Sequence, residues 1–252
     1  METYREFLER INSFEKKEPS FGDTYFGVSP SVVQKVAEDN GFKKFYGDTV
    51  VFNLDDKIKG KLAECVEKLY ATAPECFAKR LAASTYHMTL HDLSNASALA
   101  DVAEQVFWNE LAVLERMEKC RDIASAAYAK NDGASGNARN IKMRCKYIFN
   151  MVNTSLVLGL YPADENEYVK LMKLYELFDE VKPLSYPLTP HITLAYYNVH
   201  GFSAEAAMRL TAVVQELNEQ IEGLEVELDC GNLCYQKFTS MDEYYDVVRL
   251  GK

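Results

Sequence analysis

The chain contains nearly the same phrase twice, about a hundred residues apart: "STYHMTL" ends at residue 90 and "LTPHITL" at residue 194. Each phrase places a His-apolar-Thr triplet inside an apolar run, although the chain has only four histidines. Each triplet also follows the same order of patterns, first a strand, then a helix, then the strand that carries the histidine. This duplicated unit constrains the fold most, because it predicts two lobes related by pseudo-symmetry.

The first copy of the unit begins at residues 47–54. There "GDTVVFNL" opens with a turn signal and continues as an apolar, β-branched run that predicts a strand. The following "DDKIKGKLAECVEKLYATAP" has apolar residues at helical spacing and ends at a proline, so we expect a helix. The stretch "FAKRLAASTYHMTLHDL" then ends in a second strand, which carries His87.

The second copy begins at residues 146–162, where "KYIFNMVNTSLVLGLYP" predicts one or two strands. The next segment, "ADENEYVKLMKLYELFDEV", predicts a helix with acidic residues in its first turn, which suit the positive end of the helix dipole. The run "YPLTPHITLAYY" then predicts the strand that carries His191. We interpret the acidic stretches that precede both helices as helix N-termini.

The other segments surround this duplicated core. Residues 1–45 are expected to form an N-terminal helical arm, and residues 97–140 a helical insertion that ends in the loop "GASGNARN". We expect one bilobal domain over 46–252, with lobe 1 at about 46–96 and lobe 2 at about 141–235. Near the C-terminus, "SAEAAMRLTAVVQELNEQIEG" predicts a helix, and the aromatic-rich tail after it predicts two strands in a hairpin.

The two triplets carry the chemistry that the sequence offers. Side chains alternate faces along a strand, so His87 shares a face with Thr89, and His191 shares a face with Thr193. If pseudo-symmetry brings the two strands together, both pairs converge on one cleft. Histidine gives or takes a proton near neutral pH, and threonine hydroxyls can donate to phosphate oxygens. The set suits cleavage of a phosphodiester, with the histidines catalytic and the threonines binding the phosphate.

Two further residues are candidates for substrate contact. His91 has the parity of His87, although "HDLSN" also indicates a strand end, where a capping or surface role fits. Tyr197 lies an even number of residues from His191 and so shares its face of a regular strand, which leaves Tyr196 facing the core. A one-residue bulge would reverse both tyrosine assignments. The alternative is that both triplets are purely structural. The two histidines would then lie in the core with their hydrogen bonds satisfied, and the threonines would reflect strand propensity alone.

Composition excludes several classes of function. The formal net charge of −10 disfavours extended nucleic-acid binding but allows a small anionic ligand in a local pocket. No apolar run is long enough to span a membrane, and the charged N-terminus lacks a signal-peptide pattern, so we expect a cytoplasmic protein. The six cysteines lack a zinc-ligand spacing and predict free, mostly buried thiols.

The paired triplets, "HMT" at 87–89 and "HIT" at 191–193, resemble the motifs of the 2H phosphoesterase superfamily. This superfamily includes 2′-5′ RNA ligase-like proteins and cyclic nucleotide phosphodiesterases, and the stretches around the triplets are similar to a bacterial and fungal subgroup without an assigned substrate. The resemblance covers about residues 45–235. It implies an α+β, bilobal, LigT-like fold in which two antiparallel-rich sheets form a central cleft with helices outside.

In function, the resemblance implies a phosphoesterase that needs no metal and no cofactor. Its substrate would be a cyclic or 2′-5′-type phosphodiester of a small nucleotide or RNA end. Two alternatives stay open: an enzyme of the same fold that ligates or trims RNA ends, and a non-catalytic module that binds a nucleotide. The sequence leaves undetermined the base and linkage, the histidine that acts as base, and the oligomeric state.

Overall fold

The computed structural model describes residues 2–15, 21, 24–129 and 140–251, so most of the loop expected before residue 140 lies outside the described residues. The helices are α1 Tyr4–Glu15, α2 Val32–Lys35, α3 Asp56–Thr72, α4 Ala103–Ala129, α5 Glu165–Asp179 and α6 Ala204–Ile221. The strands are β1 Tyr46–Asn53, β2 His87–Ala96, β3 Asn140–Met151, β4 Ser155–Pro162, β5 His191–Tyr196, β6 Glu225–Asp229, β7 Leu233–Ser240 and β8 Glu243–Arg249.

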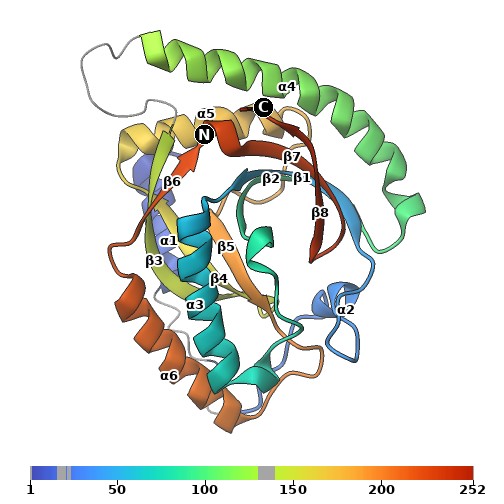
Figure 1. Ribbon diagram of the computed structural model, residues 1–252, viewed down its shortest axis with the longest axis vertical. Helices are drawn as coiled ribbons and strands as arrows, with labels where there is room; N and C mark the ends of the chain where they lie inside the picture. Colours follow the sequence, from blue (N-terminus) through green and yellow to red (C-terminus); the bar gives the residue numbers. More distant parts are fainter. Residues whose placement is uncertain (1, 16–20, 22–23, 130–139, 252) are drawn as a thin grey trace.

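The strands form a curled antiparallel sheet in the order β6-β3-β4-β5-β2-β1-β7-β8 (Figure 1). The expected α+β fold with two pseudo-symmetric halves is confirmed. The two expected sheets are four-stranded halves of one sheet, joined where Met88 of β2 pairs with Ile192 of β5. Counted outward from this seam, β5, β4, β3 and β6 on one side correspond to β2, β1, β7 and β8 on the other.

The strands next to the seam strands are the most deeply covered. All eight residues of β4 are buried, and the six interior residues of β1 are buried as well. A strand that is covered on both faces needs a continuous apolar run instead of an alternating one. This requirement explains why "TVVF" and "LVLGLY" predicted strands correctly while showing no polar face.

Each strand-helix-strand unit starts its helix with an aspartate. Asp55 accepts a hydrogen bond from the amide of Ile58 at 2.8 Å before α3, and Asp164 accepts one from the amide of Glu167 at 3.0 Å before α5. Such N-cap carboxylates satisfy an amide without a helical partner and interact favourably with the helix dipole. The interpretation of the acidic stretches as helix N-termini is thus confirmed.

The C-terminal tail contains three strands, where the sequence predicted two. β6 pairs with β3 at one end of the sheet, whereas β7 and β8 form a hairpin beside β1 at the other end. A turn of three residues, Cys230–Asn232, joins β6 to β7. The sheet must therefore curl far enough to bring its two ends close together. The alternating pattern of the tail predicted strands but did not indicate which partner each one joins.

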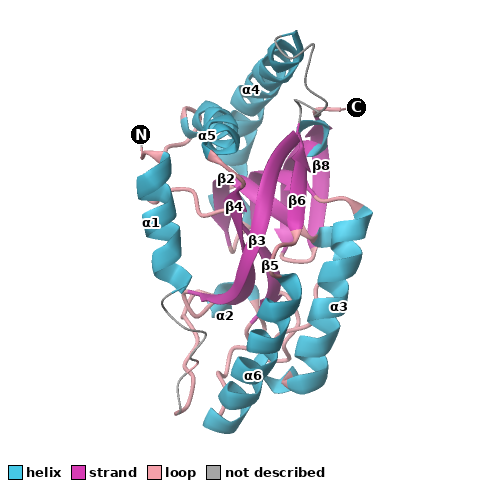
Figure 2. Ribbon diagram, turned by 90° about the vertical axis from the view of Figure 1, so that its left-hand side faces the viewer, coloured by secondary structure: helices cyan, strands magenta, loops and turns pink. Residues whose placement is uncertain are grey.

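The helices cover the outside of the curled sheet. Figure 1 shows α3 and α6 side by side along one flank and α4 with α5 along another. Figure 2 shows α1 on the side of the sheet opposite α3 and α6. α1 is anchored by the fully buried Phe7, whose ring lies 5.0 Å from that of Tyr168 in α5. Arg10 of α1 also donates to the carbonyl oxygen of Leu188 at 2.8 Å, close to the start of β5.

None of the helices in the described part of the chain combines the length and hydropathy needed to cross a membrane. All six cysteines are free thiols, as predicted; Cys65 is partly exposed and the other five are buried.

A buried carboxylate lies under α4 and provides a test of the fold. Asp48 of β1 is 1% exposed; it accepts hydrogen bonds from the hydroxyl of Tyr235 at 2.9 Å and from Asn109 of α4 at 3.3 Å. Burial nevertheless raises the pKa of Asp48 from 3.8 to about 6. Since the folded chain holds this proton more tightly than the unfolded chain, ionisation of Asp48 increasingly opposes folding as the pH rises between these two values.

We therefore expect Asp48→Asn to raise the free energy of unfolding at about pH 8 by up to about 3 kcal/mol. Urea unfolding of both proteins at about pH 8 and about pH 4 measures the effect, which should shrink at the lower pH. A variant that is less stable than the parent at the higher pH would contradict the assignment.

Candidate active site

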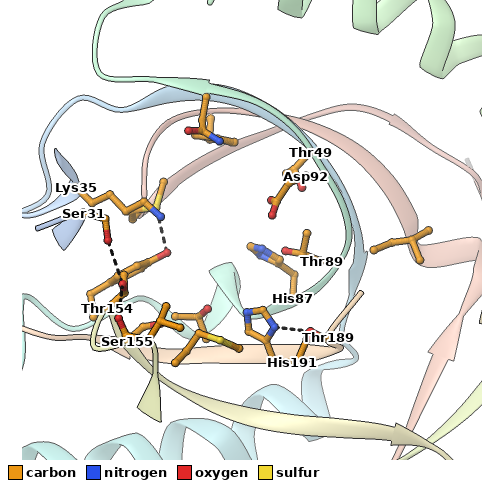
Figure 3. A pocket seen from close by; sticks show the side chains of 18 of the residues that line it. Ser31, Lys35, Thr49, His87, Thr89, Asp92, Thr154, Ser155, Thr189 and His191 are labelled. Carbon is orange, nitrogen blue, oxygen red and sulfur yellow. Dashed lines mark hydrogen bonds between the residues drawn. The ribbon is translucent and has the colours of Figure 1, made fainter. Parts of the chain in front are cut away.

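A cavity of about 450 Å³ lies at the seam between the two halves of the sheet. Its volume is in the range of small-molecule binding sites. Both predicted triplets line it: His87 and Thr89 come from β2, and His191 and Thr193 come from β5 (Figure 3). The structure thus brings together the four residues that the sequence singled out in the two triplets.

The pairing of Met88 with Ile192 determines how the triplets face each other. In antiparallel register this pair sets His87 across from Thr193 and His191 across from Thr89. The apolar residue in the middle of each triplet is fully buried on the opposite face, which holds the polar pair toward the cavity. Each imidazole therefore lies near a hydroxyl of the other half.

The two histidines are held by matching hydrogen bonds. Nδ1 of His87 donates to the carbonyl oxygen of Thr85 at 2.7 Å, and Nδ1 of His191 donates to the carbonyl oxygen of Thr189 at 2.7 Å. Because a carbonyl oxygen can only accept, Nδ1 carries the proton in each neutral ring. The other nitrogen, Nε2, keeps its lone pair on both rings. The ring of Tyr244 also packs against His87, with ring centroids 5.0 Å apart.

Burial in the cleft lowers the basicity of both rings. It lowers the pKa of His87 from 6.5 to about 4, with a smaller contribution from the nearby His191, and it lowers the pKa of His191 as well. The backbone hydrogen bonds and the carboxylate of Asp92 act in the opposite direction on both rings. In the free protein both imidazoles are neutral at pH 7.

A bulge follows the threonine of the first triplet. The pairing register of β2 with β1 skips Leu90, so side-chain alternation restarts one residue later. As a result, Asp92 lines the cavity and His91 turns away from it. His91 is 1% exposed, and its Nε2 lies 3.4 Å from a carboxylate oxygen of Asp179. The structure places this predicted contact residue in the interior.

The second triplet is followed by the same irregularity. The register of β5 with β4 skips Leu194, so Tyr196 lines the cavity and Tyr197 is fully buried on the other side. The sequence assignment of these two tyrosines assumed a regular strand, and the bulge reverses it. The hydroxyl of Tyr197 has no hydrogen-bond partner among the described residues. Its ring packs against the rings of Phe21, Phe26, Phe77 and Phe202.

The cavity has further polar groups that the sequence did not single out. Asp92 accepts a hydrogen bond from the hydroxyl of Tyr186 at 3.0 Å on the side of the histidines. On the other side, Figure 3 shows Lys35 and Ser31 of the N-terminal segment next to Thr154. These residues come from segments distant in sequence. Apart from the two histidines, Lys35 and Asp92 are the charged groups among the described residues that line the cavity.

In the described part of the chain, no group of three or more His, Cys, Asp or Glu side chains is arranged to hold a metal ion. The polar groups of the cavity can instead exchange protons through two imidazoles and donate hydrogen bonds through several hydroxyls. This combination suits an anionic ligand with a reacting oxygen.

No protein-family model matches the chain, and no curated protein matches it. Among solved structures, a conserved protein of unknown function from Agrobacterium tumefaciens matches with a TM-score of 0.56 and 14% identity, over 88% of this chain and 100% of that chain. At this identity the likeness shows the fold alone.

Two further matches have lower scores. LigT of E. coli, solved with 3′-AMP, matches with a TM-score of 0.41 and 13% identity over 82% of this chain and 97% of that chain. Usb1 of Kluyveromyces marxianus, solved with uridine monophosphate, matches with a TM-score of 0.38 and 12% identity over 80% and 95%. With TM-scores below 0.5, neither match bears on the activity of this chain.

The burial of Tyr197 can be tested through stability. We expect Tyr197→Phe to raise the free energy of unfolding by about 1 kcal/mol, because it removes a desolvated hydroxyl that has no partner among the described residues. Tyr196→Phe is the matched control, since the hydroxyl of Tyr196 contacts the sulfur of Met241 at 3.1 Å, and no gain is expected there. Denaturant unfolding measures both, and a loss of stability in Tyr197→Phe would show that its hydroxyl is satisfied.

Proposed function

We propose that this protein is a phosphoesterase that hydrolyses a cyclic or 2′-5′-type phosphodiester of a small nucleotide or RNA end. The observation that carries the proposal is the matched pair of bonds from Nδ1 of His87 and His191 to backbone carbonyls. They leave two Nε2 atoms free to exchange protons with a ligand in the cavity that both rings line. One imidazole on each side of a phosphorus atom is the arrangement that acid–base catalysis of this reaction requires.

In the proposed reaction, Nε2 of one histidine takes a proton from a water molecule as the water oxygen bonds to phosphorus. Nε2 of the other histidine, protonated beforehand, gives its proton to the ribose oxygen as the bond from phosphorus to that oxygen breaks. The site gains one proton at the base and loses one at the acid, and exchange with solvent restores the starting state. The hydroxyls of Thr89 and Thr193 donate to the non-bridging oxygens and stabilise the charge that develops on them.

The lowered pKa of both rings fits this cycle when the substrate is bound. A phosphodiester between the rings is an anion, and a nearby negative charge favours the protonated form of an imidazole. Asp92 already acts in this direction on both histidines. The negative charges of the substrate and of Asp92 together raise the pKa of the histidine that acts as acid, so that it holds its proton. The second ring remains neutral and acts as base.

The lining of the cavity favours a small ligand over extended RNA. Its charged groups among the described residues are Lys35, Asp92 and the two histidines, and the chain as a whole carries a net charge of −10. A surface that tracks a long polyanion would need many cations. The proposal therefore gives preference to a nucleotide or a single RNA terminus.

We expect His87→Ala and His191→Ala each to lower kcat by about 10²–10⁴-fold, because each removes one proton-transfer partner. The double variant should be little worse than the more impaired single variant, since the two groups act as a unit. Turnover of 2′,3′-cyclic mononucleotides, cyclic dinucleotides and 2′-5′ oligoadenylates, with and without a chelator, measures the effect.

His200→Ala is the matched control, because His200 is exposed and does not line the cavity. Near-full turnover by the double variant would rule out the mechanism. Tight binding of these probes without product would rule out hydrolysis.

The pH dependence follows from the lowered pKa of both rings. kcat/KM should rise as the base loses its proton and fall as the acid loses its own, with an optimum on the acidic side of neutrality, because burial lowers the pKa of both rings in the free protein. Asp92→Asn removes a charge that raises both values, so the optimum should move to lower pH. A pH–rate profile of both proteins checks this, and an optimum on the alkaline side of neutrality would contradict it.

A further inference from the structure

Lys35, Ser31 and Thr154 form a polar wall of the cavity that the proposed chemistry does not use. Figure 3 shows these three residues together on one side of the cavity, with His87 and His191 on the other. The hydroxyl oxygens of Ser31 and Thr154 are 3.1 Å apart. A ligand that fills the cavity from one side to the other would contact both sets of groups.

The wall is built by docking the N-terminal segment onto the turn between β3 and β4. Val152 and Asn153 have positive φ values of 42° and 56°, the pattern of a tight hairpin turn, and a β-branched residue rarely adopts it. The side-chain amide of Asn153 donates a hydrogen bond to the carbonyl oxygen of Gly27 at 3.0 Å. The backbone carbonyl oxygen of Asn153 accepts a hydrogen bond from the amide of Ser29 at 2.8 Å. These bonds bring Ser31, and Lys35 one helical turn later, to the cavity.

The ammonium group of Lys35 has no carboxylate partner among the described residues. It lies 5.3 Å from the ring centroid of Phe45 and 5.5 Å from that of Tyr196, and the side chain is partly buried. The rings attract the cation but do not neutralise it. The acidic residue described in the lining, Asp92, lies on the histidine side (Figure 3). A partly desolvated cation of this kind is stabilised by an anionic ligand.

We propose that Lys35, Ser31 and Thr154 form a second anion site, so that the substrate carries a phosphomonoester in addition to the phosphodiester held by the histidines. The inference rests on the proposed function for the nature of the first group. An ammonium and hydroxyl donors gathered at one place match the several terminal oxygens of a phosphomonoester. The substrate class is then a phosphodiester of a small nucleotide with a separate terminal phosphate.

The test compares two pairs of probes that differ by one phosphate. The first pair is adenosine 2′,3′-cyclic phosphate with and without a 5′-phosphate, and the second is the 2′-5′-linked adenosine dinucleotide with and without a 5′-phosphate. In the parent protein, kcat/KM should be about 10- to 100-fold higher for the phosphorylated member of at least one pair, as expected for charge-assisted hydrogen bonds. A ratio near one for both pairs would overturn the inference.

Lys35→Met should reduce this ratio to near one, and Ser31→Ala should reduce it by a smaller factor. Lys57→Met is the matched control: it removes the same charge from an exposed helical lysine that does not line the cavity, and it should keep the parent ratio. An unchanged ratio in Lys35→Met would overturn the inference. If Lys35→Met does not fold, Ser31→Ala decides in its place, because it removes a hydroxyl with little loss of packing.

Binding to the His87→Ala, His191→Ala double variant separates this inference from the proposed hydrolysis. Calorimetry compares adenosine 3′,5′-bisphosphate with adenosine 3′-monophosphate, with and without Lys35→Met. If the bisphosphate binds at least about tenfold more tightly and Lys35→Met removes the difference, the second anion site stands even when no probe is turned over. If probes are turned over but both nucleotides bind equally, the result supports the proposed hydrolysis and contradicts the second anion site.

Discussion

The antiparallel contact between β2 and β5 is the constraint on which the rest of the structure depends. One pair, Met88 with Ile192, joins two four-stranded halves and at the same time decides which side chains meet in the cavity. A slip of either strand by one residue would send its histidine into the core and its central apolar residue into the cavity. The burial of Met88 and Ile192 opposes that slip, so the packing of the core and the geometry of the site are secured by the same contact.

The backbone next to each triplet fixes the orientation and the tautomer of the histidine. Each imidazole is oriented by a carbonyl two residues earlier, so the strand that carries the ring also selects its tautomer. Local backbone geometry of this kind can be duplicated with the sequence unit, which accounts for its presence in both halves. The rings differ in the cations near them, since Lys59 lowers the pKa of His87 and Lys35 lowers the pKa of His191, whereas Asp92 acts in the same direction on both.

Much of the fold could be predicted because it follows from local patterns. Helical spacing located α3, α5 and α6, and the repeated triplets located the seam. The bulges at Leu90 and Leu194 could not be predicted, because a bulge depends on the partner strand as well as on the residues that form it. For that reason the parity argument selected Tyr197 and His91, while the cavity is lined by the residues beside them. Lys35 was missed because its position depends on a docking contact between distant segments.

The two bulges also break the symmetry that the duplication creates. At matching positions after the triplets, one half presents the carboxylate of Asp92 and the other the phenol of Tyr196, over whose ring the ammonium of Lys35 lies. The cavity thus has a negative end and a positive end, and an electric field runs between them. A ligand whose two ends differ in charge binds with different energies in its two orientations. The pocket therefore selects one orientation of the ligand, although it is assembled from two similar halves.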